Sequence, residues 1–107
     1  MVGWRVWDVM RAIDYLETRD DVESSRIAVM GISGGGTIAF FLSALDTRIA
    51  AAVVSGYFQE REGLYQEPIY RNVFGLLAEF GDAEVASLIA PRTLIIAALA
   101  IDTFRAR

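Results

Sequence analysis

The sequence of 107 residues contains neither cysteine nor histidine, and each absence excludes a class of chemistry. Without cysteine, the chain can form no disulfide bond and no thiolate metal site. Without histidine, a metal ion could be held only by carboxylate and carbonyl oxygens, which suit hard ions. We therefore expect no metal and no cofactor. The absence of histidine also removes the imidazole side chain, which ordinarily exchanges a proton near neutral pH.

Lysine is also absent, so arginine supplies all ten positive charges against fourteen carboxylates, for a net charge of −4. The arginines are scattered, so we expect no binding to nucleic acid. No apolar run approaches the roughly 20 residues of a membrane-spanning helix, so we expect no membrane segment. Residues 1–10 include Trp4, Arg5, Trp7 and Asp8 and do not resemble a signal peptide, which predicts a cytoplasmic protein.

The apolar pattern predicts a single α/β domain over residues 1–107, in which helices flank a short parallel sheet of about three strands in three layers. Short apolar runs predict buried strands over Arg26–Met30, Ile49–Val54 and Thr93–Ile101. Helical spacing predicts helices over Val6–Thr18, Thr37–Leu45, Val73–Phe80 and Glu84–Ile89. The long connection over residues 55–72 is a candidate functional loop.

A Gly-x-Ser-x-Gly pattern, Gly31-Ile32-Ser33-Gly34-Gly35, lies between a predicted strand and a predicted helix. In that position the pattern is typical of a nucleophile elbow, which holds a serine hydroxyl above a sheet. Because the serine backbone is strained there, we expect Gly31 and Gly35 to be required for their small size. The backbone N–H of Gly34 and the positive end of the following helix would face an oxyanion.

Two phosphate-binding interpretations compete with the elbow. A P-loop would need lysine where Thr37 stands, and a dinucleotide-binding turn would need glycine in place of Ser33. In a third interpretation the glycines have no chemical role and only allow a strand and a helix to pack closely. The independently predicted strand and helix favour the elbow.

Further segments resemble a known family: Arg5–Asp8 with Ala12–Leu16, Arg26–Gly35, Asp46–Ile49 with Ala51–Gly56, and Leu88–Arg92. Over about residues 4–96 the chain resembles the α/β-hydrolases, in particular the acetyl xylan esterase and dienelactone-hydrolase-like branch. The resemblance implies a truncated fragment, a partial hydrolase core that lacks the strands on both sides and the catalytic histidine. It also implies that the catalytic acid follows the third predicted strand, where Asp102 stands.

Without an imidazole, the base would have to be a carboxylate, either Asp102 or one of Glu60, Glu62 and Glu67. A carboxylate is the weaker base because its pKa lies about two units below that of histidine. We therefore expect weak hydrolysis of short-chain or activated esters, with a small ester as the partner molecule. The alternative is an inactive fragment that self-associates or binds a ligand.

The sequence also predicts roles for features outside the motif. Two open sheet edges predict a homo-oligomer, formed by edge pairing or by exchange of elements. Trp4 and Trp7 are expected to pack on the sheet or on a partner, and Arg92 is expected to be structural. The aromatic residues of the long connection are candidates for an acyl pocket: Tyr57, Phe58, Tyr65 and Tyr70.

Overall fold

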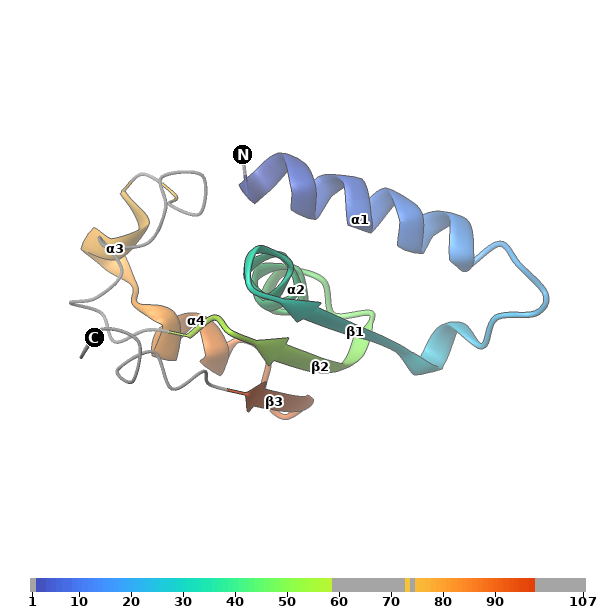
Figure 1. The fold of residues 1–107 in the computed structure, drawn as a ribbon. Helices are drawn as coiled ribbons and strands as arrows, with labels where there is room; N and C mark the ends of the chain where they lie inside the picture. The colour runs from blue at the N-terminus through green and yellow to red at the C-terminus, as the bar shows by residue number, and fades with distance from the viewer. Residues whose placement is uncertain (1, 59–72, 74, 98–107) are drawn as a thin grey trace.

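The computed structural model of the chain describes residues 2–58, 73 and 75–97. In these described ranges the helices and strands follow one another in the order that the sequence predicts (Figure 1). The elements are α1 (Val2–Leu16), the 3-10 turn η1 (Ser24–Arg26), β1 (Ile27–Ile32), α2 (Gly34–Leu45), β2 (Ile49–Ser55), α3 (Leu76–Glu79), α4 (Asp82–Ser87) and β3 (Thr93–Ala97). The part of the third predicted strand beyond residue 97 lies outside the described residues. No helix among the described residues is long and apolar enough to cross a membrane.

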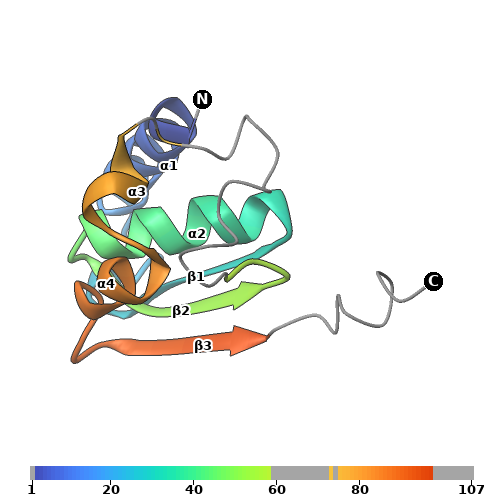
Figure 2. The ribbon, with the colours of Figure 1, turned by 90° about the vertical axis from the view of Figure 1, so that its left-hand side faces the viewer.

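The three strands form one sheet in the order β1-β2-β3, and both neighbouring pairs are parallel. Helix α2 packs on β1 and β2, and α1 packs on α2. Each strand lies beside the strand that follows it in the sequence, so the sheet grows in a single direction. Right-handed connections then place the intervening helices on the same face of the sheet. Figure 2 shows the described helices together on one side of the strands. The short parallel sheet flanked by helices that the sequence predicted is confirmed, and the described helices lie on one face of that sheet.

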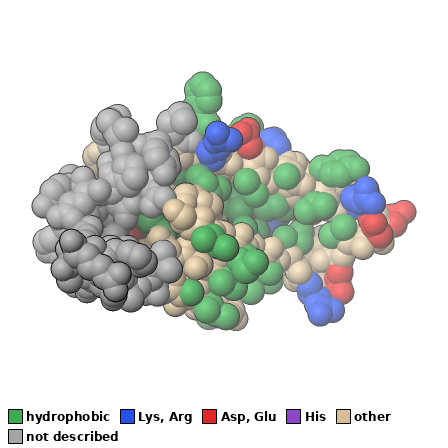
Figure 3. All heavy atoms as spheres, viewed as in Figure 1, with side chains coloured by type: hydrophobic (Ala, Val, Ile, Leu, Met, Phe, Trp, Pro, Cys, Tyr) green, Lys and Arg blue, Asp and Glu red, His purple; other side chains and the backbone are tan. Residues whose placement is uncertain are grey.

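No helix among the described residues covers the opposite face of the sheet, and we call this face the open sheet face. In register across the three strands it presents the rows Ala28–Ala51–Thr93, Met30–Val53–Ile95 and Ile32–Ser55–Ala97. Met30, Ile32 and Ile95 expose 72%, 67% and 53% of their surface. The strands predicted to be buried are therefore covered by the described residues on one face only. Figure 3 shows hydrophobic side chains gathered on the molecular surface, with charged groups mostly towards its edges.

The core lies between α2 and the covered face of the sheet. Phe40 and Leu42 of α2 are completely buried there. The Phe40 ring centroid lies 5.9 Å from that of Tyr57 and 5.7 Å from that of Phe58. These two aromatic residues after β2 therefore pack in the core rather than line an acyl pocket. The other two candidates for that pocket, Tyr65 and Tyr70, lie outside the described residues.

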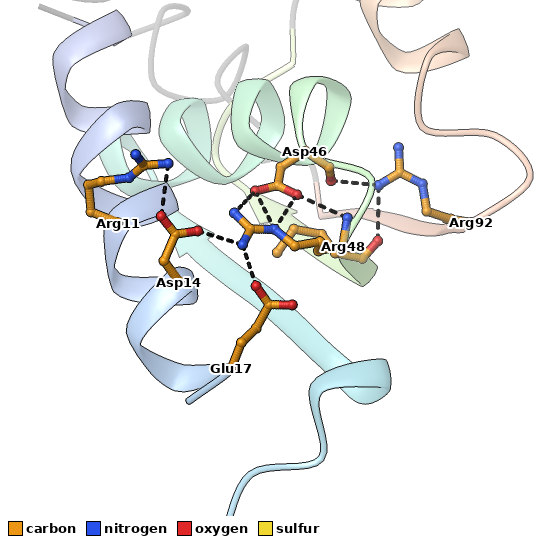
Figure 4. Close-up of polar contacts among 7 residues, drawn as sticks. Arg11, Asp14, Glu17, Asp46, Arg48 and Arg92 are labelled. Carbon is orange, nitrogen blue, oxygen red and sulfur yellow. Dashed lines mark hydrogen bonds and ion pairs between the residues drawn. The ribbon is translucent and has the colours of Figure 1, made fainter. Parts of the chain in front are cut away.

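An ionic cluster around Arg48 joins α1 to the turn between α2 and β2 (Figure 4). The Arg48 guanidinium donates to Asp14 and Glu17 of α1 at 2.6 Å each and to the carboxylate of Asp46 at 2.7 Å. The guanidinium of Arg48 lowers the pKa of Asp46, and that carboxylate in turn raises the pKa of Arg48. Asp46 is only 7% exposed, so its charge depends on this arginine.

Arg92 supports the same turn from the other side. Its guanidinium donates to the backbone carbonyls of Asp46 and Ile49, at 3.1 and 2.9 Å, and to that of Leu88 at 3.1 Å. The structural role predicted for Arg92 is thereby confirmed.

We predict that Arg48→Met lowers the free energy of unfolding at neutral pH, because the buried Asp46 carboxylate loses its counter-charge. The folded pKa of Asp46 lies below its unfolded value, which is about 3.9. The stabilisation is therefore present above that value and is lost as the pH falls through the folded pKa. Urea unfolding followed by circular dichroism should show the two proteins converging in acid.

The matched control for this variant is Arg26→Met, which removes an ion pair to Glu23 between two largely exposed side chains. Its free energy of unfolding should change by no more than about 0.5 kcal/mol. An equal loss in the two variants, or a difference that does not depend on pH, would contradict the role given to Asp46.

Candidate functional site

The connection between β1 and α2 consists of one residue, Ser33. Its backbone angles are φ 56° and ψ −116°, and it is the only described residue other than glycine with a positive φ. Such a conformation costs about 1–3 kcal/mol, so the surrounding structure must hold it in place. Ser33 is exposed, and its side chain makes no capping hydrogen bond to α2. We call residues 31–36 the Ser33 turn.

Backbone contacts hold the Ser33 turn. The N–H of Ser33 donates to the carbonyl of Ser55 at the end of β2, at 2.8 Å. The carbonyl of Ser33 accepts from the N–H of Thr37 at 3.1 Å, which closes the first turn of α2. The serine is thus tied to the neighbouring strand on one side and to the helix on the other.

Two glycines of the turn are required by close contacts. A Cβ atom added at Gly31 would overlap the carbonyl of Gly35 and lie 2.8 Å from the backbone nitrogen of Gly36. A Cβ atom added at Gly36 would lie 2.8 Å from the carbonyl oxygen of Ser55. One added at Gly35 meets no described atom within 4 Å. The expected steric role of Gly31 is confirmed, whereas the second close approach falls at Gly36 and not at Gly35, because Gly36 faces β2.

The remaining residues of the motif lie on both sides of the serine. Gly34 is the first residue of α2, where backbone N–H groups have no acceptor within the helix. Ile32 is the last residue of β1, and its side chain lies on the open sheet face. Asp102, Glu60, Glu62 and Glu67, the candidate bases, lie outside the described residues. The residues that the structure describes include no group of three or more acidic side chains that could hold a metal ion.

A buried polar pair behind the turn was not predicted from the sequence. Tyr57 follows β2 and is 4% exposed, and its Cβ lies 3.5 Å from the position of a Cβ at Gly36. Its hydroxyl donates to a carboxylate oxygen of Asp82 at 3.2 Å, and Asp82, the first residue of α4, is 2% exposed. The pair joins α4 to the segment that packs against the Ser33 turn. No sequence signal links these residues, since they lie 25 positions apart.

A hollow of about 340 Å³ adjoins the turn. It extends from Arg5 and Asp8 of α1, past Met30 of β1, to Gly35. Its lining is otherwise apolar and comes from both helices and the strand. Of residues 31–36, only Gly35 lines this hollow, which therefore lies beside the Ser33 turn and not at the Ser33 side chain.

A strand, a strained serine and a helix on a parallel sheet define the architecture of an α/β-hydrolase, and comparison with known proteins agrees. Residues 1–62 match the family described as "Glucuronyl esterase, fungi". This match covers more than half of the chain, so the chain belongs to the glucuronyl esterase family. The resemblance to α/β-hydrolase esterases that the sequence suggested is confirmed.

Individual relatives support the same assignment. The protein named "Putative hydrolase YtaP" of Bacillus subtilis (strain 168) is 35% identical over 98 residues, which are 86% of this chain and 33% of that protein. A structure of a glucuronoyl esterase from Solibacter usitatus is 26% identical with a TM-score of 0.65, covering 87% of this chain and 29% of that one. A promiscuous CE15 esterase from the marine bacterial metagenome shares the fold, with a TM-score of 0.67 at 22% identity over 91% of this chain and 30% of that one. The chain thus spans about a third of the length of these relatives.

We predict that Gly31→Ala destabilises the protein by about 1–3 kcal/mol or more, because its methyl group must displace the backbone of α2. Gly35→Ala is the matched control: the added methyl meets open space, and alanine favours the helix by up to about 0.5–1 kcal/mol. Urea unfolding of both variants measures the difference. Equal stabilities would show that the close approach at Gly31 is not required.

Proposed function

We propose that Ser33 is the nucleophile of a carboxylic ester hydrolase. The observation that carries the proposal is its backbone conformation, φ 56° and ψ −116°, at the single-residue connection between β1 and α2. A strained, exposed residue at such a junction is typical of functional sites, where strain serves to present a reacting group. Membership of an esterase family supports the same conclusion.

The expected reaction follows from the geometry of the turn. The Ser33 oxygen attacks the ester carbonyl carbon while its proton passes to a base, and the carbonyl oxygen acquires the negative charge. The N–H of Gly34 and the amino end of α2 are the groups that would stabilise this oxyanion. The alcohol then leaves with a proton, and water cleaves the acyl-serine ester.

The chain supplies only carboxylates as a base, and we keep Asp102 as the candidate that the family resemblance indicates, with Glu60, Glu62 and Glu67 as others. Because a carboxylate is a weaker base than imidazole, we expect weak turnover of short-chain or activated esters. The family name points to esters of glucuronic acid as substrates of the longer relatives. The single domain over residues 1–107 and the cytoplasmic location stay predictions.

A second candidate function is an inactive fragment that self-associates or binds a ligand. The open sheet face favours it, since Met30, Ile32 and Ile95 are largely exposed. Both β1 and β3 lie at edges of the described sheet, where unpaired backbone groups can pair with another chain. A homo-oligomer would cover both features.

We predict that a fluorophosphonate probe labels Ser33, since the probe reacts with an activated serine hydroxyl. Mass spectrometry of the labelled peptides identifies the site, and p-nitrophenyl acetate hydrolysis gives the accompanying rate. We expect the wild type to exceed the uncatalysed rate by about 10³- to 10⁴-fold at most, as hydrolases without a complete triad do. Ser33→Ala should lose both signals.

The matched control for the probe experiment is Ser25→Ala, which removes an exposed serine from η1. This variant should label and turn over as the wild type does. Hydrolysis at equal rates in wild type and Ser33→Ala would remove Ser33 from the mechanism and favour the inactive fragment.

Self-association is tested by size-exclusion chromatography with light scattering. We expect the wild type to form an oligomer, and Met30→Glu with Ile95→Glu to shift it towards the monomer, because both changes place charge in one row of the open sheet face. A wild type that remains monomeric at micromolar concentration would contradict the oligomer.

A further inference from the structure

Both tryptophans of the chain lie on α1 and are exposed. Trp4 exposes 81% of its surface and Trp7 55%, so neither ring packs on the sheet, and of the two predicted roles only packing on a partner stays a prediction. An exposed indole keeps a large apolar face in water, which is costly unless the ring is used. The proposed reaction at Ser33 gives these two rings no role.

The two rings share their helix face with a carboxylate. Trp7 and Asp8 follow Trp4 by three and four residues, and residues at these spacings are neighbours of Trp4 on the surface of a helix. Together they line a hollow of about 280 Å³. Asp8 forms no ion pair with any residue in the described part of the chain. It also lines the neighbouring hollow that extends from Arg5 to Gly35.

Trp7 already contacts one cation. The guanidinium carbon of Arg11 lies 4.0 Å from the centre of the Trp7 ring, the arrangement of a cation–π contact. Arg11 also pairs with Asp14 at 2.9 Å and does not line the hollow. The Arg11 contact shows that a positive group is held against this ring within the protein itself.

We propose that the hollow lined by Trp4, Trp7 and Asp8 binds an organic cation, specifically an alkylated ammonium group. Two indole rings attract a positive charge through their negative faces, and the carboxylate of Asp8 adds a full negative charge. An alkylated ammonium suits the site because its methyl groups contact the rings and its weak hydration makes desolvation cheap. Since the site is exposed and small, we expect a dissociation constant on the order of 1 mM.

The test is a titration of intrinsic tryptophan fluorescence with choline, at ionic strength held constant with sodium chloride. Because the chain has two tryptophans and both line the hollow, the whole indole emission reports on this site. We expect a saturable change with choline. The uncharged molecule of the same shape, 3,3-dimethyl-1-butanol, should bind at least about five-fold more weakly, because it keeps only the apolar contact.

Variants that preserve both indoles separate charge from shape. Asp8→Asn should weaken choline binding about three- to ten-fold, whereas Asp20→Asn, the same change at an exposed residue outside the helix, should not. Trp4→Ala should weaken binding as well, read from the remaining Trp7. Ser33→Ala should bind choline as the wild type does, so that this result is independent of the proposed esterase activity.

Three outcomes would overturn the proposal: no saturable change with choline, equal affinity for choline and its uncharged analogue, or equal effects of Asp8→Asn and Asp20→Asn. The second outcome would mean that choline binds through apolar contacts alone. The third would mean that binding depends on the overall surface charge and not on Asp8. Far-UV circular dichroism of each variant verifies that α1 is intact.

Discussion

The hydrogen bond from the N–H of Ser33 to the carbonyl of Ser55 is the constraint on which the candidate site depends. It fixes a serine in a conformation that costs about 1–3 kcal/mol, and it joins the end of β1 to the end of β2. The close approaches at Gly31 and Gly36 exist because α2 must begin directly after this residue. The pairing of β1 with β2, the start of α2 and the exposed position of Ser33 therefore depend on one another.

The one-directional strand order explains the distribution of charged and apolar surface. With the described helices on one face, the Arg48 cluster fastens α1 and the α2–β2 turn together, while the other face presents uncharged rows across three strands. Parallel sheets are ordinarily covered on both faces. The described residues cover only one face, so the rows that contain Met30, Ile32 and Ile95 leave apolar surface exposed.

Much of the fold was predictable because apolar spacing is a local property. The sequence predicted that α2 begins at Thr37, three residues after its observed start at Gly34. Glycine has low helix propensity, so Gly34–Gly36 was interpreted as a turn. The strands were predicted as buried because their side chains are apolar on both faces, and only the structure shows that one face, with Met30 and Ile95, is open. For Asp102 and the glutamates of the long connection, the structure describes no position.

The sequence by itself determined which segments become helices and strands and where the strained turn forms, since Gly31-Ile32-Ser33-Gly34 acts within a few residues. Only the tertiary structure decided that Gly36 rather than Gly35 is the second required glycine, because its neighbour is Ser55 on another strand. The same holds for the pairing of Tyr57 with Asp82 and for the exposure of Trp4 and Trp7. These facts depend on which distant segments the strand order brings together, and local patterns carry no information about that.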